Sequence, residues 1–222
     1  NQIKQNSSKN ILSSFHPINN FLPDAIEEKT AYKKLNLSPK KKYILFAGLI
    51  RKYKGLDLLI DAFKKISKEI PELELLIAGE FYDDKRKYYE QIKNHQIENK
   101  VKIFDYFQSR DDLRDLFCIS KIVVLPYKSA SQSGIIPLAY KYLRPIVTTD
   151  LPGLSNQILE DKTGIICKIN SDSIANGIKK ALESKNYVKM KSQISLKIKS
   201  YTWESFSLKA MNFIKNINNI NK

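Results

Sequence analysis

The stretch LPYKSASQSGIIPLAYKYLRPIVTTD, residues 125–150, decides the fold of this chain. An apolar strand at 122–125 runs into a small polar loop, and Gly134 then opens a mostly apolar helix that stops before a second strand at 146–149. This order is typical of a βαβ unit. A Ser/Gly turn at the start of the helix presents free backbone N–H groups and the positive end of the helix dipole, so it suits an anion.

The same alternation of strands and helices extends on both sides of this stretch. Apolar runs predict further strands at 43–47, 73–78, 101–106 and 164–168, and helical spacing or capping residues predict helices at 55–70, 84–92, 111–119, 172–184 and 203–217. Such an order predicts a Rossmann-like α/β fold, a parallel sheet with helices on both faces. Ligands of these sheets bind at the carboxyl ends of the strands, where the strand order reverses.

The composition restricts the class of protein. Cys118 and Cys167 lie in apolar sequence and are expected to be core residues of a cytosolic protein rather than a disulfide. No apolar run approaches the ~20 residues that a membrane span needs. The net charge of +15 suits phosphorylated ligands or an anionic membrane surface, although a general lysine bias would give the same charge. The basic residues are dispersed and no motif supports nucleic-acid binding.

The chain divides into three parts. Residues 1–42 are expected to be a lead-in between domains, with a short helix capped by Asp24 and Glu27. Residues 43–200 carry the alternating pattern, and residues 201–222 form a terminal helix.

The turn GLIRKYKG at 48–55 is the first candidate site. Gly48 allows a tight exit from its strand, and Arg51 and Lys54 put two cations beside the next helix, which suits a diphosphate. A basic surface turn in a chain with 38 basic residues is the equally simple alternative.

The loop SASQSG at 129–134 is the second candidate site. Its small residues would let a ligand approach the backbone, and its hydroxyl and amide groups add hydrogen-bond donors. The alternative is an ordinary helix start, with Ser131 or Ser133 as the cap.

Other polar residues give weaker signals. Glu80 follows a third strand and would accept hydrogen bonds from ligand hydroxyls, or would simply be an exposed carboxylate. Asp83 and Asp84 favour helix N-terminal charges over a metal site, and His16 and His95 are isolated, so no metal is predicted. Walker A, G-x-G-x-x-G and nucleophile-elbow patterns are absent, and no catalytic residue can be named.

Four stretches together resemble the C-terminal, donor-binding half of the family 4 (group 1) glycosyltransferases of the GT-B fold. They are FAGLIRKYKGLDLLIDAF at 46–63, LLIAGEFYDD at 75–84, the opening stretch extended to 125–154, and DKTGIIC at 161–167. The resemblance implies one half of a GT-B enzyme, so the N-terminal domain with the acceptor-side catalytic groups would be missing. It also implies that 201–222 packs toward that missing domain.

The resemblance assigns roles to particular residues. The donor diphosphate would be held by Gly48, Arg51, Lys54, Ser133, Gly134 and Ile135; the donor sugar and ribose by Ser131, Gln132 and Glu80; and the base by Tyr106 and Phe107. No metal or cofactor is expected, since the nucleotide sugar is the substrate.

Three positions depart from the family pattern. Ser131 and Ala139 stand where members commonly carry a pair of glutamates, and Leu49 stands where many carry an arginine. A serine can still bind a sugar, but an alanine cannot bond a ribose, so the mode of ribose binding stays open.

The resemblance implies a retaining, hexosyltransferase-type enzyme that moves a sugar from a nucleotide-diphosphate sugar to a glycan or lipid-linked acceptor. Cell-envelope polysaccharide synthesis, in the cytoplasm or at the inner face of the membrane, is the expected setting. The fragment alone is expected to be inactive. A non-catalytic nucleotide-sugar-binding module and half of a nucleotide-sugar epimerase are the alternatives. Base, sugar, acceptor, linkage and oligomeric state are left open.

Overall fold

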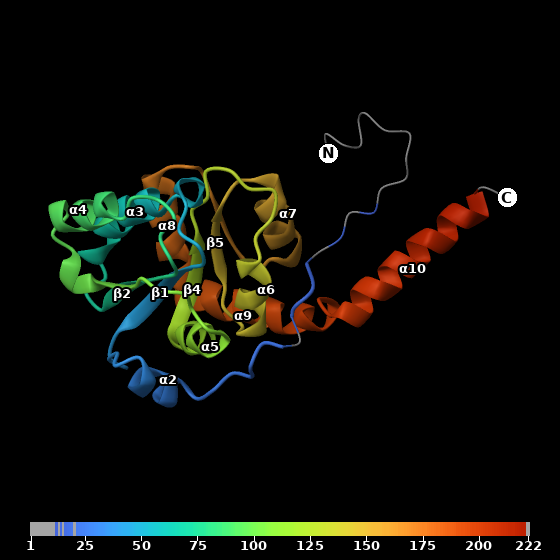
Figure 1. Ribbon diagram of the computed structural model, residues 1–222, viewed down its shortest axis with the longest axis horizontal. Coiled ribbons are helices and arrows are strands. Elements are labelled where there is room, and N and C mark those ends of the chain that lie inside the picture. Colours follow the sequence, from blue (N-terminus) through green and yellow to red (C-terminus); the bar gives the residue numbers. More distant parts are fainter. Residues whose placement is uncertain (1–11, 13, 15, 20, 221–222) are drawn as a thin grey trace.

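In the computed structural model, which describes residues 12, 14, 16–19 and 21–220, one parallel six-stranded sheet forms the centre (Figure 1). Its strands are β1 Lys42–Ala47, β2 Leu73–Ala78, β3 Val101–Phe104, β4 Ser120–Leu125, β5 Ile146–Thr149 and β6 Gly164–Cys167. Their spatial order is β3-β2-β1-β4-β5-β6, and all neighbours pair in parallel. The predicted fold class is therefore confirmed, and the strand order reverses between β1 and β4.

Successive side chains of a strand point to opposite faces of the sheet. Both faces are apolar here, so helices cover both and form two cores. In β1, Ile44 and Phe46 join the first core, whereas Tyr43 and Leu45 join the second. The first core packs against α3 Leu56–Ser67, α4 Arg86–Asn94 and α8 Ser171–Leu182. The second packs against α2 Glu28–Lys34, α5 Arg110–Ile119, α6 Ile135–Lys141 and α7 Pro152–Asp161. The remaining helical segments are η1 Lys52–Lys54, η2 Glu98–Lys100, α9 Ser184–Lys197, η3 Ile198–Ser200 and α10 Trp203–Ile220.

The predicted elements are present, with ends that differ by a few residues. The helix expected at 84–92 begins at Arg86, because the Asp84 carboxylate accepts the Arg86 backbone N–H at 3.0 Å and so belongs to the preceding turn. The strand expected to reach Tyr106 ends at Phe104, and Gln108 donates its side-chain amide to the carbonyl of Phe104 and to that of Tyr106, which follows the strand.

The predicted capping of the first helix is wrong. That helix begins at Glu28, and its cap residue Glu27 makes no side-chain capping bond. The Asp24 carboxylate instead accepts a hydrogen bond from Lys141 Nζ at 2.8 Å. Asp24 therefore pairs with Lys141 of α6 rather than with the start of the helix, and this contact joins the lead-in to the sheet domain.

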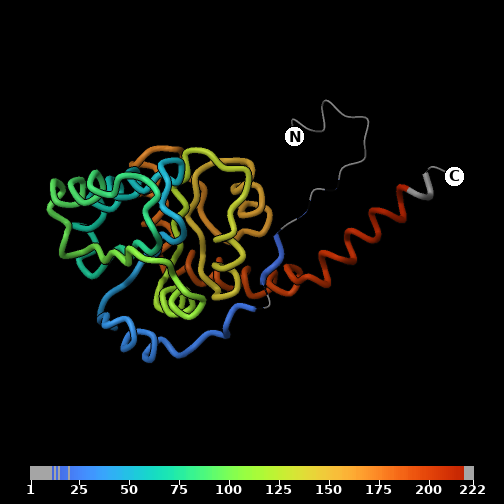
Figure 2. The backbone as a smooth tube through the Cα atoms, in the orientation of Figure 1, coloured from blue at the N-terminus to red at the C-terminus, as the bar shows by residue number. Residues whose placement is uncertain are grey.

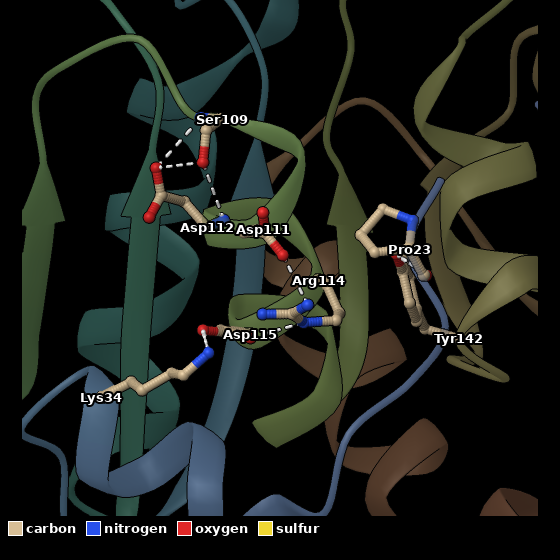
Figure 3. A network of polar contacts seen from close by, with 8 residues as sticks. All are labelled: Pro23, Lys34, Ser109, Asp111, Asp112, Arg114, Asp115 and Tyr142. Carbon is tan, nitrogen blue, oxygen red and sulfur yellow. Dashed lines mark hydrogen bonds and ion pairs between the residues drawn. The ribbon is translucent and has the colours of Figure 1, made fainter. Parts of the chain in front are cut away.

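Ser109 caps α5, and a polar network surrounds this cap (Figure 3). Ser109 Oγ accepts the Asp112 N–H at 3.1 Å, and the Asp112 carboxylate accepts the Ser109 N–H at 3.0 Å. Further along α5, Arg114 pairs with Asp115 at 2.7 Å. Asp115 also pairs with Lys34 of α2 at 3.6 Å, so the network joins the lead-in helix to the sheet domain.

The lead-in and the segment that precedes α10 meet beside α7. The Ile18 N–H donates to the Tyr201 carbonyl at 2.8 Å, and Tyr201 donates its hydroxyl to the buried carboxylate of Asp161. Beyond Tyr201, α10 extends away from the body (Figure 2). It carries exposed Trp203, Leu208, Met211 and Ile214. None of the helices in the described part of the chain is both long and apolar enough to cross a bilayer.

Candidate functional site

The sequence-predicted site residues lie at one edge of the sheet. Gly48 follows β1, Glu80 follows β2, Tyr106 follows β3 and the loop containing Ser131 follows β4. All of these positions are carboxyl ends of parallel strands, the edge at which such sheets bind ligands.

Two glycines bring the exits of β1 and β2 into contact. Gly48 has φ +99° and Gly79 has φ +140°, and a β-carbon added to Gly79 would lie only 2.4 Å from the Gly48 carbonyl oxygen. The Ile50 N–H then donates to the Glu80 carbonyl at 2.8 Å. The backbone after β1 is therefore fixed before the basic residues begin.

The turn at 48–55 packs against the loop after β4. Gly55 has φ +68°, and a β-carbon added there would lie 2.0 Å from the Pro126 carbonyl oxygen. The Lys128 N–H donates to the Tyr53 carbonyl at 2.7 Å, and Lys128 Nζ donates to the Asp57 carboxylate at 2.5 Å. The two sequence-predicted turns thus form one continuous structure across the switch point.

Lys54 is a buried cation in this structure, with only 9 % of its surface exposed. A β-carbon added to Gly48 would lie 3.0 Å from Lys54 Nζ and 3.3 Å from Ile135 Cδ1, so Lys54 of the first turn and Ile135 of the second both approach Gly48. No carboxylate among the described residues lies within ion-pair distance of it. Burial, and secondly the charge of Arg51, lower the pKa of Lys54 to about 8. An unpaired buried charge is costly, which favours a bound anion at this place.

Arg51 lies on the exposed side of the same turn. Its guanidinium carbon is 4.7 Å from the centre of the Tyr82 ring, and within the described residues it has no carboxylate partner. Arg51, Tyr82 and Lys128 are among the residues that line an open hollow of about 600 Å³. Two cations without counter-ions, three residues apart, can together bind an extended polyanion.

Ser133 rather than Ser131 bonds the start of α6. Ser133 Oγ accepts the Ile135 N–H at 3.2 Å and lies 3.3 Å from the Tyr127 hydroxyl. Gly134 is the cap residue, with an ordinary φ of −66°, and a β-carbon added to it would meet nothing within 4 Å. Backbone geometry does not require glycine here, so its effect is to leave the space above the turn open.

Ser131 and Gln132 line a second hollow, of about 340 Å³, rather than the one beside Arg51. A β-carbon added to Gly153 would lie 1.9 Å from the Ser131 carbonyl oxygen, so α7 closes one side of it. Amide and carboxylate groups of α7, including Asn156, also line this hollow. Its polar lining can bind the hydroxyl groups of a sugar.

The remaining sequence-predicted positions lie apart from Lys54. Tyr106 and Phe107 are exposed at the edge strand β3, which β2 separates from β1. Ala139 is fully buried in α6, so no polar group reaches a ligand from that position. The acidic pair is engaged in ion pairs, Asp84 with Arg86 at 2.9 Å and Asp83 with Lys87 at 3.9 Å. Within the described chain, no group of three or more metal-binding side chains occurs.

Four residues of the site were not predicted from the sequence: Tyr53, Asp57, Tyr127 and Lys128. Tyr127 is 2 % exposed and lies under Lys54 Nζ, with 5.5 Å from the nitrogen to the ring centre. Tyr53 packs edge-on against the Tyr127 ring, with 6.1 Å between ring centres. The position of Tyr127 directly after an apolar strand and a proline was the available signal, since that position faces the ligand edge.

Comparison with known proteins gives consistent matches. Residues 27–201 match the family model of the group 1 glycosyl transferases. A lipopolysaccharide 1,2-N-acetylglucosaminetransferase of Salmonella typhimurium is 26% identical over 206 residues, covering 83% of this chain and 51% of that protein. This chain spans about half the length of the curated relatives it matches.

Solved structures of low sequence identity share the fold. HepE of Anabaena in complex with UDP and glucose has a TM-score of 0.72 at 16% identity, with 86% of this chain and 55% of that chain covered. The C-terminal domain of the group 1 family protein LpcC of Francisella tularensis has a TM-score of 0.68 at 19% identity, with 82% and 96% covered.

Proposed function

Because this chain belongs to the group 1 glycosyl transferases, we propose that it is the donor-binding half of a retaining enzyme that transfers a sugar from a nucleotide-diphosphate sugar. The acceptor would be a glycan or a lipid-linked sugar, as the name of the Salmonella relative suggests. A hexose is the proposed sugar, and the proposed setting is cytoplasmic or peripheral to the membrane, in synthesis of the cell envelope.

The observation that carries the proposal is that two cations at the switch point, Lys54 and Arg51, have no carboxylate partner in the described chain. Lys54 is buried without a carboxylate partner in the described chain, and Arg51 stands three residues away without one. A nucleoside diphosphate supplies the missing negative charge. The nucleoside diphosphate is the leaving group, and its negative charge increases as its bond to the sugar breaks. Fixed cations beside it therefore lower the barrier to transfer. We propose that they do so without a metal ion.

The other donor-binding roles rest on the same edge of the sheet. We propose that Gly48 and the segment 133–135 surround the diphosphate, and that Ser131, Gln132 and Glu80 lie by the sugar and ribose. Tyr106 and Phe107 would lie by the base. The complex of HepE with UDP and glucose supports a donor of this class.

We propose that the other half of the enzyme is a second Rossmann-like domain that carries the acceptor-side groups. Half-length coverage of the relatives and the match to an isolated C-terminal domain support this division. The lead-in near Ile18 and the helix after Tyr201 leave the body together, and both would run to the missing half. The exposed apolar residues of α10 would then be covered, and the chain alone would transfer no sugar.

Calorimetric titration with UDP, GDP and ADP, free and as sugar conjugates, tests the proposed ligand. We expect one nucleoside diphosphate to bind selectively, and Arg51→Ala to weaken that binding about 10-fold, since a charge-assisted hydrogen bond is worth about 1.5–3 kcal/mol. Lys189→Ala, which removes an exposed cation on α9, is the matched control and should bind as the parent does. Equal binding by the parent and Arg51→Ala would contradict the assignment.

A non-catalytic binding module is the second candidate. The buried Ala139 and the exposed Ser131 remove both carboxylates that family members commonly place by the donor, which favours this reading. An experiment on the full-length protein distinguishes the two candidates. An enzyme consumes the nucleotide sugar in the presence of acceptor, whereas a binding module leaves the nucleotide sugar intact.

A further inference from the structure

We propose that Tyr127 is a positioning residue of the diphosphate site: its ring holds the Lys54 ammonium and its hydroxyl holds Ser133. This inference rests on the proposed function, because it explains how the two turns are held ready for one ligand. Tyr127 comes from the loop after β4, whereas Lys54 comes from the turn after β1, so the contact crosses the switch point.

The ring of Tyr127 is the electron-rich surface that faces the Lys54 ammonium. Lys54 Nζ lies 5.5 Å from the ring centre, within the range of a cation–π interaction, and no described carboxylate pairs with it. Tyr127 is 2 % exposed, and Tyr53 packs edge-on against it, so the ring orientation is fixed by packing. A desolvated cation gains more from such a ring than an exposed one does.

The hydroxyl of Tyr127 reaches the second turn. It lies 3.3 Å from Ser133 Oγ, and that oxygen accepts the Ile135 N–H at 3.2 Å. One buried side chain therefore links the cation of the first turn to the hydroxyl and amide of the second. A bound phosphate would meet groups that Tyr127 has already set in place.

Several other charged or titratable groups lie in the segments packed around Lys54, and of these the charge of Arg51 lowers its pKa. They are Arg51 and Tyr53 on the same turn, Asp57 paired with Lys128, and Glu80 after β2. The test therefore changes Tyr127 alone and leaves these groups in place.

The test measures the protonation of Lys54 directly, as the pH dependence of its acylation by an amine-reactive ester, located by mass spectrometry. Tyr127→Phe keeps the ring and should leave the pH midpoint unchanged. Tyr127→Leu removes the ring and should move the midpoint down by about half to one pH unit, the size expected for a lost cation–π interaction. Tyr142→Leu, the same change in a buried tyrosine at the far end of α6, should leave it unchanged.

Nucleotide titration at pH 7.5 completes the test. Tyr127→Leu should bind the preferred nucleoside diphosphate about 5-fold more weakly, and Tyr127→Phe about 2-fold more weakly through loss of the Ser133 contact. If circular dichroism shows that the leucine variant is unfolded, Tyr127→Met takes its place. An unshifted acylation midpoint in a folded variant without the ring overturns the inference. Because acylation needs no nucleotide, failure of nucleotide binding would refute the proposed function alone.

Discussion

Replacing Lys54 by methionine is expected to weaken diphosphate binding strongly and, at the same time, to stabilise the fold. The side chains have similar length and Met is apolar, so the substitution removes a buried charge without opening a large cavity. Affinity for the preferred nucleoside diphosphate should fall about 100-fold, because the charge-assisted hydrogen bonds of the ammonium are lost. The free energy of unfolding in urea should rise by about 2 kcal/mol at pH 7. This value follows from the lowered pKa of Lys54, reduced because solvent screens part of the cost of burying the ammonium.

The pH dependence of that stability gain gives a second check. Burial lowers the pKa of Lys54 from 10.5 in the unfolded chain to about 8 in the folded one. Below pH 8 both states carry the proton, so the folded parent bears the full cost and the methionine variant has its largest advantage. As pH rises from about 8 to 10.5 the folded parent releases its proton first, and the advantage should decline toward zero. A variant that is less stable than the parent at pH 7 would contradict this account of Lys54.

Replacing Gly55 by alanine is expected to destabilise the protein by about 3 kcal/mol or more. The added β-carbon would lie 2.0 Å from the Pro126 carbonyl oxygen, a rigid backbone atom, and φ of +68° is itself unfavourable for alanine. Relief requires the turn at 48–55 to move away from the loop after β4. Urea unfolding should show the loss of stability, and nucleotide binding should weaken in the protein that remains folded.

Gly134→Ala is the matched control for this substitution. Gly134 has φ of −66° and open space where the β-carbon would go, so its replacement should change stability by less than about 0.5 kcal/mol. Equal stability losses at Gly55 and Gly134 would show that the close contact between the two turns is absent in solution.

The architecture was predictable from the sequence because the local pattern of each element favours the same structure that the folded chain adopts. Apolar strands at regular spacing, Gly48 and Gly55 beside them, and Ser109 before a helix each have one simple structural consequence. The cap of the first helix, α2, was predicted wrongly. Asp24 has the chemistry of a cap, but a lysine more than 100 residues away takes its carboxylate, and no local pattern reveals such a partner.

The site was predictable in position and less so in its contacts. Strand ends predict which edge of the sheet would bind a ligand, and the basic turn makes Arg51 and Lys54 candidates for it. The burial of Lys54 and the ring of Tyr127 beneath it depend on how the β1 turn meets the β4 loop, which only the folded structure reveals. Likewise, the division of Arg51 and Ser131 between two hollows cannot be read from spacing along the chain.

The most direct test of the central claim is a crystal structure of this chain with its preferred nucleoside diphosphate bound. We predict phosphate oxygens within about 3 Å of Lys54 Nζ and of the Arg51 guanidinium, the usual length of charge-assisted hydrogen bonds. The diphosphate should lie between the turn at 48–55 and the start of α6. A nucleotide bound elsewhere, or one whose phosphates leave Lys54 without a partner, would contradict the account.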